Sequence, residues 1–208
     1  FNVMHTEILS ADQRELLPII KLFRKEFYLV GGTAIALQLG HRRSVDFDLF
    51  TSKPFGSKRI LNAFEKAEKK VTVTRRVSEQ LNLSVDGVKM TFFEYPYAVD
   101  ADVSDMSFRM PELLSLAAMK AFALGRRSKW KDYVDLYFLL RDTFSLNEIA
   151  QKAEEIFSEE FSAKLFRSQL AYHKDIDYSE QVDYMPGYVV HDEEVRQFLV
   201  DKALEDML

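Results

Sequence analysis

Two carboxylates separated by one residue are the chemically informative feature of this sequence. Asp46 and Asp48 stand in the segment DFDLF at residues 46–50, where polar and apolar residues alternate. In a strand this alternation puts both carboxylates on one face, while Phe47 and Leu49 point into the core. Two negative charges on one face repel each other unless a cation lies between them, and carboxylate oxygens suit Mg²⁺ or Mn²⁺. The pattern therefore predicts a metal site at Asp46 and Asp48.

A pair of glycines precedes these acids and suits a phosphate. Gly31 and Gly32 follow an apolar stretch, residues 27–30, whose aromatic and β-branched side chains are typical of a buried strand. Residues 33–39 then predict a short helix, and Gly40 suits its left-handed C-terminal cap. Bare backbone N–H groups at the start of a helix bind phosphate. A plain glycine turn, or an edge strand with solvated Asp, explains either half alone, but the combination is far more specific.

Together these residues carry a resemblance to a known superfamily. The two glycines, the short helix and Asp46-x-Asp48 resemble the signature of the DNA polymerase β-like nucleotidyltransferases. The longer string, which includes Gly40-His41-Arg42 and Ser44, resembles the AbiEii/AbiGii toxin family within that superfamily. The resemblance implies that the glycine turn holds a nucleoside triphosphate and that Asp46 and Asp48 are catalytic metal ligands. The nucleotide-binding candidates are Gly31, Gly32, Thr33, Arg42, Ser44 and Lys120. For the arginine, either Arg42 or Arg43 suits a clamp on phosphate oxygens, and simple solvation of these side chains is the alternative.

A second block of the sequence matches the same family. Its members follow the family's order and spacing: Lys120, Arg127, Lys131, Asp132, Tyr133 and Asp135. The resemblance implies that Lys120 neutralises β- or γ-phosphate charge, and that Asp135 accepts a proton from the incoming hydroxyl or orients Lys120. Asp132 is the second candidate for that role. Without this context, ordinary surface pairing would be expected, such as Lys131 with Asp135 four residues later.

The third carboxylate that the superfamily usually places on a neighbouring strand is missing. Strands are predicted over residues 71–77, 80–85 and 88–95, the last two joined at a hairpin turn, Asp86-Gly87. Thr91 stands where the third acid is expected, and Glu94 is the nearest acid. Either Asp46 and Asp48 bind metal alone, or Glu94 contributes from a shifted register; a solvated Glu94 is the favoured interpretation. The remaining acids of this region are loop residues: Asp100, Asp102 and Asp105.

Composition limits the class of protein. The chain has 208 residues, of which 47% are hydrophobic, so it can bury a sizeable core. Its net charge of −5 argues against indiscriminate nucleic-acid binding, although local basic patches could engage RNA. The absence of cysteine excludes disulfides and thiolate metal sites and fits a reducing compartment. We expect a cytoplasmic protein with no membrane contact, because no apolar run suits a spanning helix and no secretory signal is apparent.

The whole sequence predicts an α/β nucleotidyltransferase domain over residues 1–109, with a mixed β-sheet flanked by helices, and a helical C-terminal domain over residues 110–208. Helices are predicted over residues 10–24, 55–70, 111–124, 146–157, 162–172 and 191–208, with another that begins near residue 130. The resemblance implies transfer of a nucleoside monophosphate from an NTP to a hydroxyl, with RNA as the acceptor. It also implies the toxin of a toxin–antitoxin or abortive-infection system, with a cognate antitoxin as partner. The alternatives are a small-molecule nucleotidyltransferase and a non-enzymatic nucleotide-binding module.

Overall fold

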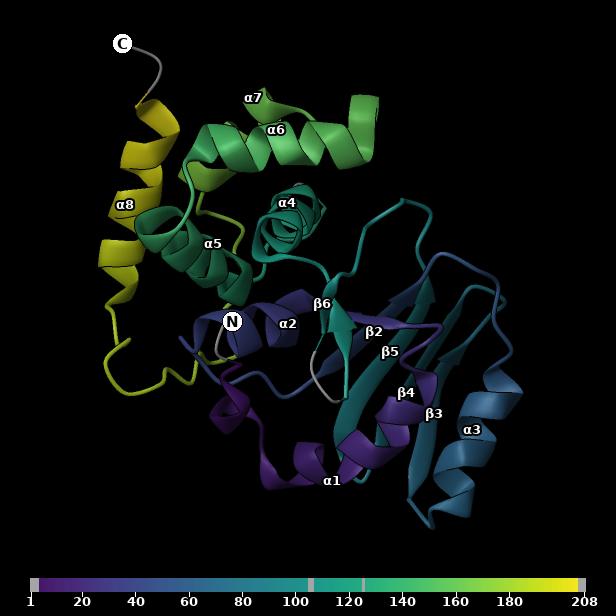
Figure 1. Cartoon of the computed structure of the whole chain (residues 1–208). Coiled ribbons are helices and arrows are strands. Elements are labelled where there is room, and N and C mark those ends of the chain that lie inside the picture. Colours follow the sequence, from purple (N-terminus) through teal and green to yellow (C-terminus); the bar gives the residue numbers. More distant parts are fainter. Residues whose placement is uncertain (1–3, 105–106, 125, 206–208) are drawn as a thin grey trace. The chain divides into compact units, whose positions relative to one another are not determined.

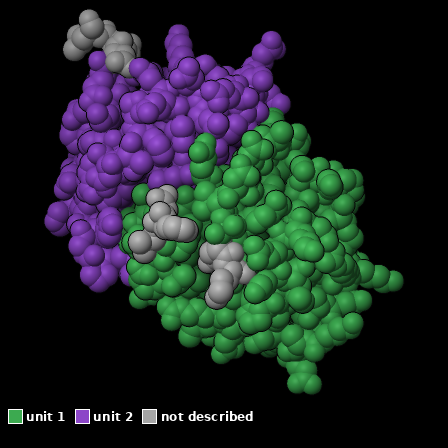
Figure 2. Space-filling model, viewed as in Figure 1, with its two compact units in different colours: residues 1–112 green, residues 113–208 purple. Residues whose placement is uncertain are grey.

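A computed structural model describes residues 4–104, 107–124 and 126–205 of the chain. The chain divides into two compact units, residues 1–112 and 113–208, which are coloured separately in Figure 2. No helix among the described residues is both long enough and apolar enough to cross a membrane.

The first unit is built on a five-stranded sheet with the order β1-β2-β5-β4-β3 (Figure 1). The β2–β5 pair is parallel and the other pairs are antiparallel, so the predicted mixed sheet is confirmed. Strands β4 and β5 join at Asp86 and Gly87, which both have positive φ, as the predicted hairpin turn requires. The strands are β1 Tyr28–Val30, β2 Phe47–Thr51, β3 Val71–Arg76, β4 Gln80–Val85 and β5 Val88–Glu94, with a separate pair, β6 Val103–Ser104 and β7 Arg109–Met110.

The two faces of this sheet differ in chemistry because side chains alternate along each strand. One face carries the buried core, where Phe92 of β5 makes edge contacts with Phe23 and Phe27. Phe64 of α3 packs near Phe23 on this same side. The other face carries Asp48 and Thr91, which are half-buried register partners. We call it the Asp48 face.

The helices of the first unit begin and end where the sequence supplies caps. Ser10 and Gln13 form the capping box that opens α1, and Gly40 closes α2 with a φ of 72°. Gln38 of α2 donates to the carbonyl of Pro111 at 3.0 Å. These helices are η1 Thr6–Ile8, α1 Ala11–Ile20, η2 Lys21–Phe23, α2 Gly31–Leu39 and α3 Ser57–Lys66.

Among the described residues of the second unit, the named elements are all helices. Helix α4 packs against α5, α6 and α7, and α8 packs against α5 and α7. A second capping box, Ser145 with Glu148, opens α6 as the sequence pattern predicts. The helices are α4 Leu113–Leu124, α5 Trp130–Asp142, α6 Leu146–Phe157, η3 Ser158–Glu160, α7 Ala163–Ala171 and α8 Asp192–Leu204.

Two boundaries near the predicted site differ from expectation. Helix α2 begins at Gly31 and not at Thr33, so the glycines form its first turn. Strand β2 begins at Phe47, so Asp46 lies just before the strand and not within it. The reason is that β1 ends at Val30, the partner of Asp48, and the Asp46 carbonyl accepts a hydrogen bond from the Thr33 side chain.

Candidate active site

The first turn of α2 lies directly against the Asp48 carboxylate. Gly31 has a φ of 73°, a left-handed conformation that favours glycine. A Cβ at this position would overlap one carboxylate oxygen of Asp48 and lie 3.3 Å from its Cγ. Only a residue without a side chain therefore lets the carboxylate approach the start of the helix this closely.

The second glycine, Gly32, lets an arginine side chain approach the helix equally closely. A Cβ on Gly32 would overlap a terminal guanidinium nitrogen of Arg42 and lie 3.3 Å from the Ser44 hydroxyl. Arg42 is 2% exposed and donates to the carbonyl of Arg43 at 2.9 Å, whereas Arg43 is exposed. The first turn of α2 is thus bordered by a carboxylate at Gly31 and a guanidinium at Gly32.

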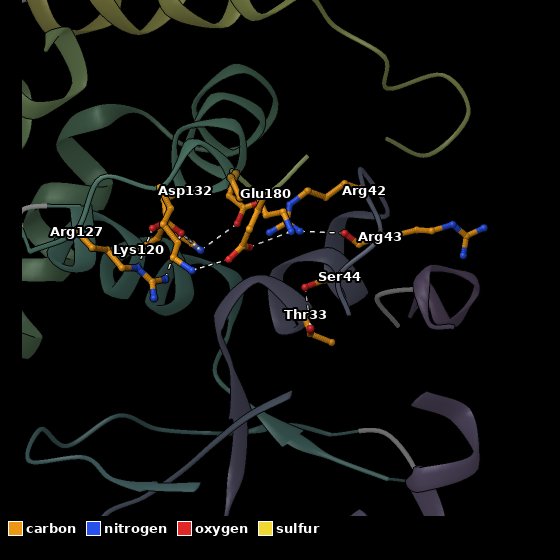
Figure 3. Close-up of polar contacts among 11 residues, drawn as sticks. Thr33, Arg42, Arg43, Ser44, Lys120, Arg127, Asp132 and Glu180 are labelled. Carbon is orange, nitrogen blue, oxygen red and sulfur yellow. Dashed lines mark hydrogen bonds and ion pairs between the residues drawn. The ribbon is translucent and has the colours of Figure 1, made fainter. Parts of the chain in front are cut away.

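A hydroxyl pair ties this helix to the segment that precedes β2. Thr33 Oγ1 lies 2.8 Å from Ser44 Oγ, and both side chains are buried (Figure 3). The Thr33 hydroxyl also donates to the backbone carbonyl of Asp46. Because these bonds hold the chain on both sides of Val45, they fix the approach of Asp46 to the sheet.

Burial alternates through the acidic segment as the sequence pattern predicts. Phe47 and Leu49 are 0% and 2% exposed, whereas Asp46 and Asp48 are half-buried. These two carboxylates supply hard oxygen donors, and the missing Cβ of Gly31 lets the Asp48 carboxylate pack against the first turn of α2. The donor chemistry of these residues suits a divalent cation, and the metal site itself stays a prediction.

The sheet register shows what stands at the position of the third acid. Thr91 is the Cα partner of Asp48, so its side chain lies beside Asp48 on the same face. Glu94 pairs with Thr51, three residues further along, and an odd spacing puts it on the opposite face. Across the part of the chain that the structure describes, no group of three His, Cys, Asp or Glu could hold a metal ion. Asp105 lies outside the described residues.

In the second unit, Lys120 of α4 joins the two acids of α5. Its Nζ lies 2.8 Å from Asp132 Oδ1 and 3.0 Å from Asp135 Oδ2. Lys120 is 4% exposed, Asp132 2% and Asp135 0%. The three-residue spacing brings both acids to one face of α5, which packs against α4. The structure therefore makes a buried ion-pair cluster of these three predicted residues.

Arg127 extends this cluster toward the surface. Its Nε donates to Asp132 Oδ2 at 2.9 Å, and its side chain is 51% exposed (Figure 3). Burial by itself would raise the pKa of Asp132, but the Lys120 and Arg127 charges outweigh it, so the pKa lies below its ordinary value. Asp132 is thus held as a carboxylate with a cation on either side.

The alternative of a surface pair between Lys131 and Asp135 is wrong. Asp135 is buried against Lys120, and Lys131 lies 3.2 Å from Glu180 instead. Glu180 also accepts from Lys129 at 2.7 Å, a bond that lowers the Glu180 pKa to about 2. Sequence analysis missed Glu180 as the partner of these lysines. Glu180 lies in the segment between α7 and α8, and no local sequence pattern predicts a contact over so many residues.

The structure thus brings together two sets of predicted residues, each within its own unit. The first unit holds the nucleotide-binding and metal-binding candidates around the start of α2: Gly31, Gly32, Thr33, Arg42, Ser44, Asp46 and Asp48. The second unit holds the cluster of Lys120, Asp132 and Asp135. The roles of these residues in catalysis stay predictions.

Solved structures share this fold. JHP933 from Helicobacter pylori matches with a TM-score of 0.58 and 18% identity, over 95% of this chain and 92% of that chain. MenT4, a nucleotidyltransferase toxin from Mycobacterium tuberculosis, matches with a TM-score of 0.59 and 13% identity, over 93% of this chain and 82% of that chain.

Sequence comparison gives the family. The uncharacterized protein aq_aa25 of Aquifex aeolicus is 32% identical over 206 residues, which cover 95% of this chain and 97% of that protein. The model of the nucleotidyl transferase AbiEii toxin family, type IV toxin–antitoxin system, matches residues 19–103 and 80–206. The resemblance inferred from the two motifs is confirmed, and the chain belongs to the AbiEii family of nucleotidyltransferase toxins.

Proposed function

We propose that this protein is a metal-dependent enzyme that moves a nucleoside monophosphate from an NTP to a hydroxyl of RNA. The observation that carries the proposal is the packing of Asp48 against Gly31 in the first turn of α2. This packing puts a carboxylate beside backbone N–H groups that suit a phosphate. Metal and triphosphate ligands would then lie side by side, as nucleotidyl transfer needs.

Asp46 and Asp48 would hold Mg²⁺ or Mn²⁺. When bound, the ion would polarise the transferred phosphoryl group and stabilise charge on the attacking and leaving oxygens. The backbone of Asp46 is held by Thr33, whose hydroxyl donates to the Asp46 carbonyl. Asp48 is positioned by the sheet, where Val30 and Thr91 are its partners on either side.

The triphosphate would be bound by the residues around the first turn of α2. Backbone N–H groups of Gly31 and Gly32 would donate to phosphate oxygens, and Arg42 would add a fixed guanidinium charge. Thr33 and Ser44 would hold this turn in place through their buried hydroxyl contact. Arg42 can fill this role without reorganising, because its side chain already packs against the helix.

In the second unit, Lys120 is the residue with a predicted role in neutralising phosphate charge. Asp132 and Asp135 both contact the Lys120 ammonium group. These contacts favour the interpretation in which the two acids orient Lys120. Asp135 is fully buried, so proton acceptance from an incoming hydroxyl is the less favoured of its two predicted roles.

Incubation with each α-labelled NTP, Mg²⁺ and total RNA tests the proposal. We expect label in RNA from the parent protein and none above background from Asp46→Asn or Asp48→Asn, each confirmed as folded by its melting curve. A Glu94→Gln variant is the matched control, because it removes a nearby carboxylate from the opposite face.

The products distinguish the alternatives. Label in an aminoglycoside or another small hydroxyl compound, and not in RNA, would favour the small-molecule enzyme. NTP binding without transfer to any acceptor would favour a non-enzymatic module, which the threonine at position 91 motivates. The antitoxin partner that a type IV system implies is tested separately, by rescue of growth when the protein is expressed with its genetic neighbour.

A further inference from the structure

Four aromatic rings gather on the Asp48 face of the sheet. Phe50 follows Asp48 by one side-chain period along β2, and its register partner on β5 is Phe93. The centroids of these two rings are 5.3 Å apart, and the Tyr95 ring lies 4.8 Å from Phe50. Tyr97 continues the series 5.1 Å beyond Tyr95. All four side chains are half-buried, so each ring keeps part of its surface accessible.

A row of polar side chains crosses the same face. Register partners run from Asp48 through Thr91 and Asn82 to Arg75, which is exposed on the edge strand β3. Lys89 of β5 also lies on this face, two residues before Thr91, and is exposed. The row thus leads from the proposed metal ligand to a positively charged edge of the sheet.

The segment around this edge has an excess of positive charge, although the net charge of the whole chain is negative. Residues 58–89 contain eight Lys and Arg and four Asp and Glu, whereas the chain as a whole has a net charge of −5. A local excess of positive charge in a chain of negative net charge favours a phosphate backbone at this edge.

We propose that the Asp48 face binds the single-stranded end of an RNA acceptor, with its bases stacked on Phe50, Phe93, Tyr95 and Tyr97. Arg75 and Lys89 would bind its phosphates. Sequence-tolerant binding of single strands combines these two elements, aromatic rings for bases and basic side chains for the backbone. The inference rests on the proposed transfer reaction, because it names where the acceptor of that reaction lies.

The number of rings favours an oligonucleotide over the base of the NTP. One nucleotide carries one base, whereas the ring series extends over Phe50, Tyr95 and Tyr97 with successive centroids about 5 Å apart. The basic side chains, Lys89 and Arg75, lie on β5 and β3 and not at α2. A single nucleotide bound at α2 would not account for them. A chain of several nucleotides uses both sets.

Binding of a fluorescent RNA octamer, oligo(A), to the full chain tests this proposal by anisotropy. Phe93→Leu and Tyr95→Leu keep apolar volume but remove a stacking surface, and we expect each to weaken binding about five- to a hundredfold. Tyr95→Phe is the matched control and should bind as the parent does, because it keeps the ring. An abasic octamer of equal charge should bind more weakly and should not distinguish the variants.

Three results would overturn the inference: no binding of oligo(A) by the parent, equal affinity in the parent and both Leu variants, or an equal loss with the abasic octamer. The inference would also be overturned if Phe93→Leu and Tyr95→Leu raised the dissociation constant for the NTP and left oligo(A) binding unchanged, because the rings would then bind the NTP base. Since these are binding measurements, failure of the transfer reaction is detected independently. Ring-dependent binding without any label transfer would reject the proposed function alone.

Discussion

Asp48 of β2 and Thr91 of β5 are register partners in the parallel pairing, with their side chains on one face of the sheet. Neighbouring strands lie about 5 Å apart, so the side chains of register partners on one face are close enough to share a ligand. The hydroxyl of Thr91 is a neutral oxygen at the position where the superfamily usually has a carboxylate. The proposed metal site therefore depends on Asp46 and Asp48 for its negative charge.

Restoring the third acid should strengthen metal binding. In Thr91→Asp, a carboxylate would stand beside Asp48, and greater ligand charge tightens divalent-cation sites, here by about tenfold or more. Mn²⁺ titration by isothermal calorimetry measures the change. Thr91→Asn is the control, since it adds similar volume without charge, and equal affinities in the two variants would contradict the metal site.

Asp46 and Glu94 should differ sharply in their importance for nucleotide transfer. Asp46→Asn removes a proposed metal ligand and should lower kcat for nucleotide transfer by about a hundredfold or more. Glu94→Gln should change kcat little, because Glu94 pairs with Thr51 on the face opposite Asp48. Steady-state transfer assays of both variants beside the parent decide this. Full activity in Asp46→Asn would end the metal-site hypothesis whatever Glu94 does.

The contact between α2 and Asp48 should not tolerate a methyl group. Gly31→Ala adds a Cβ that overlaps the Asp48 carboxylate at a φ of 73°, so we expect a loss of about 1–3 kcal/mol in the free energy of unfolding. Urea denaturation measures that loss, and Mn²⁺ titration should show weakened binding at Asp48.

Gly87→Ala separates backbone strain from this contact. Gly87 also has a positive φ, 88°, but a Cβ there meets nothing within 4 Å. This control should lose stability while it keeps the affinity of the parent for Mn²⁺. If Gly31→Ala keeps that affinity as well, the packing against Asp48 has no role in metal binding.

The buried cluster in the second unit should be costly to break. Lys120→Met leaves Asp132 and Asp135 buried without their shared cation, which should lower the free energy of unfolding by about 3–5 kcal/mol. Lys131→Met removes a partner of the half-buried Glu180 and should cost only about 0–1 kcal/mol. Urea denaturation at pH 7 compares the two variants, and equal losses would contradict a structural role for the cluster.

Lowering the pH should reduce the difference in stability between Lys120→Met and the parent protein. The neighbouring cations lower the folded-state pKa of Asp132, so its stabilising contribution is complete above its unfolded pKa of about 4 and is lost as the pH falls further. In Lys120→Met the pKa of the buried acids should rise instead, because one cation is gone. The gap in stability between this variant and the parent should therefore narrow between pH 7 and pH 4, measured by urea denaturation across that range. A gap independent of pH would show that ionisation of these acids does not matter.

Sequence alone determined the local features of this protein. The alternation around Asp48 predicted which residues are buried, the Asp86-Gly87 pair predicted a hairpin, and Ser145 with Glu148 predicted a helix start. These features depend on backbone preferences and on side chains a few residues apart, so a short segment contains all the information. The two family motifs also sufficed for the family and the fold class.

Tertiary structure decided which distant residues meet. Only the register of β2 against β5 puts Thr91 beside Asp48 and turns Glu94 to the other face, because one residue of slip would exchange the two faces. Likewise, only the packing of α4 on α5 buries Lys120 between its acids. Such partners are chosen by the fit of whole elements, and no short stretch of sequence records that fit.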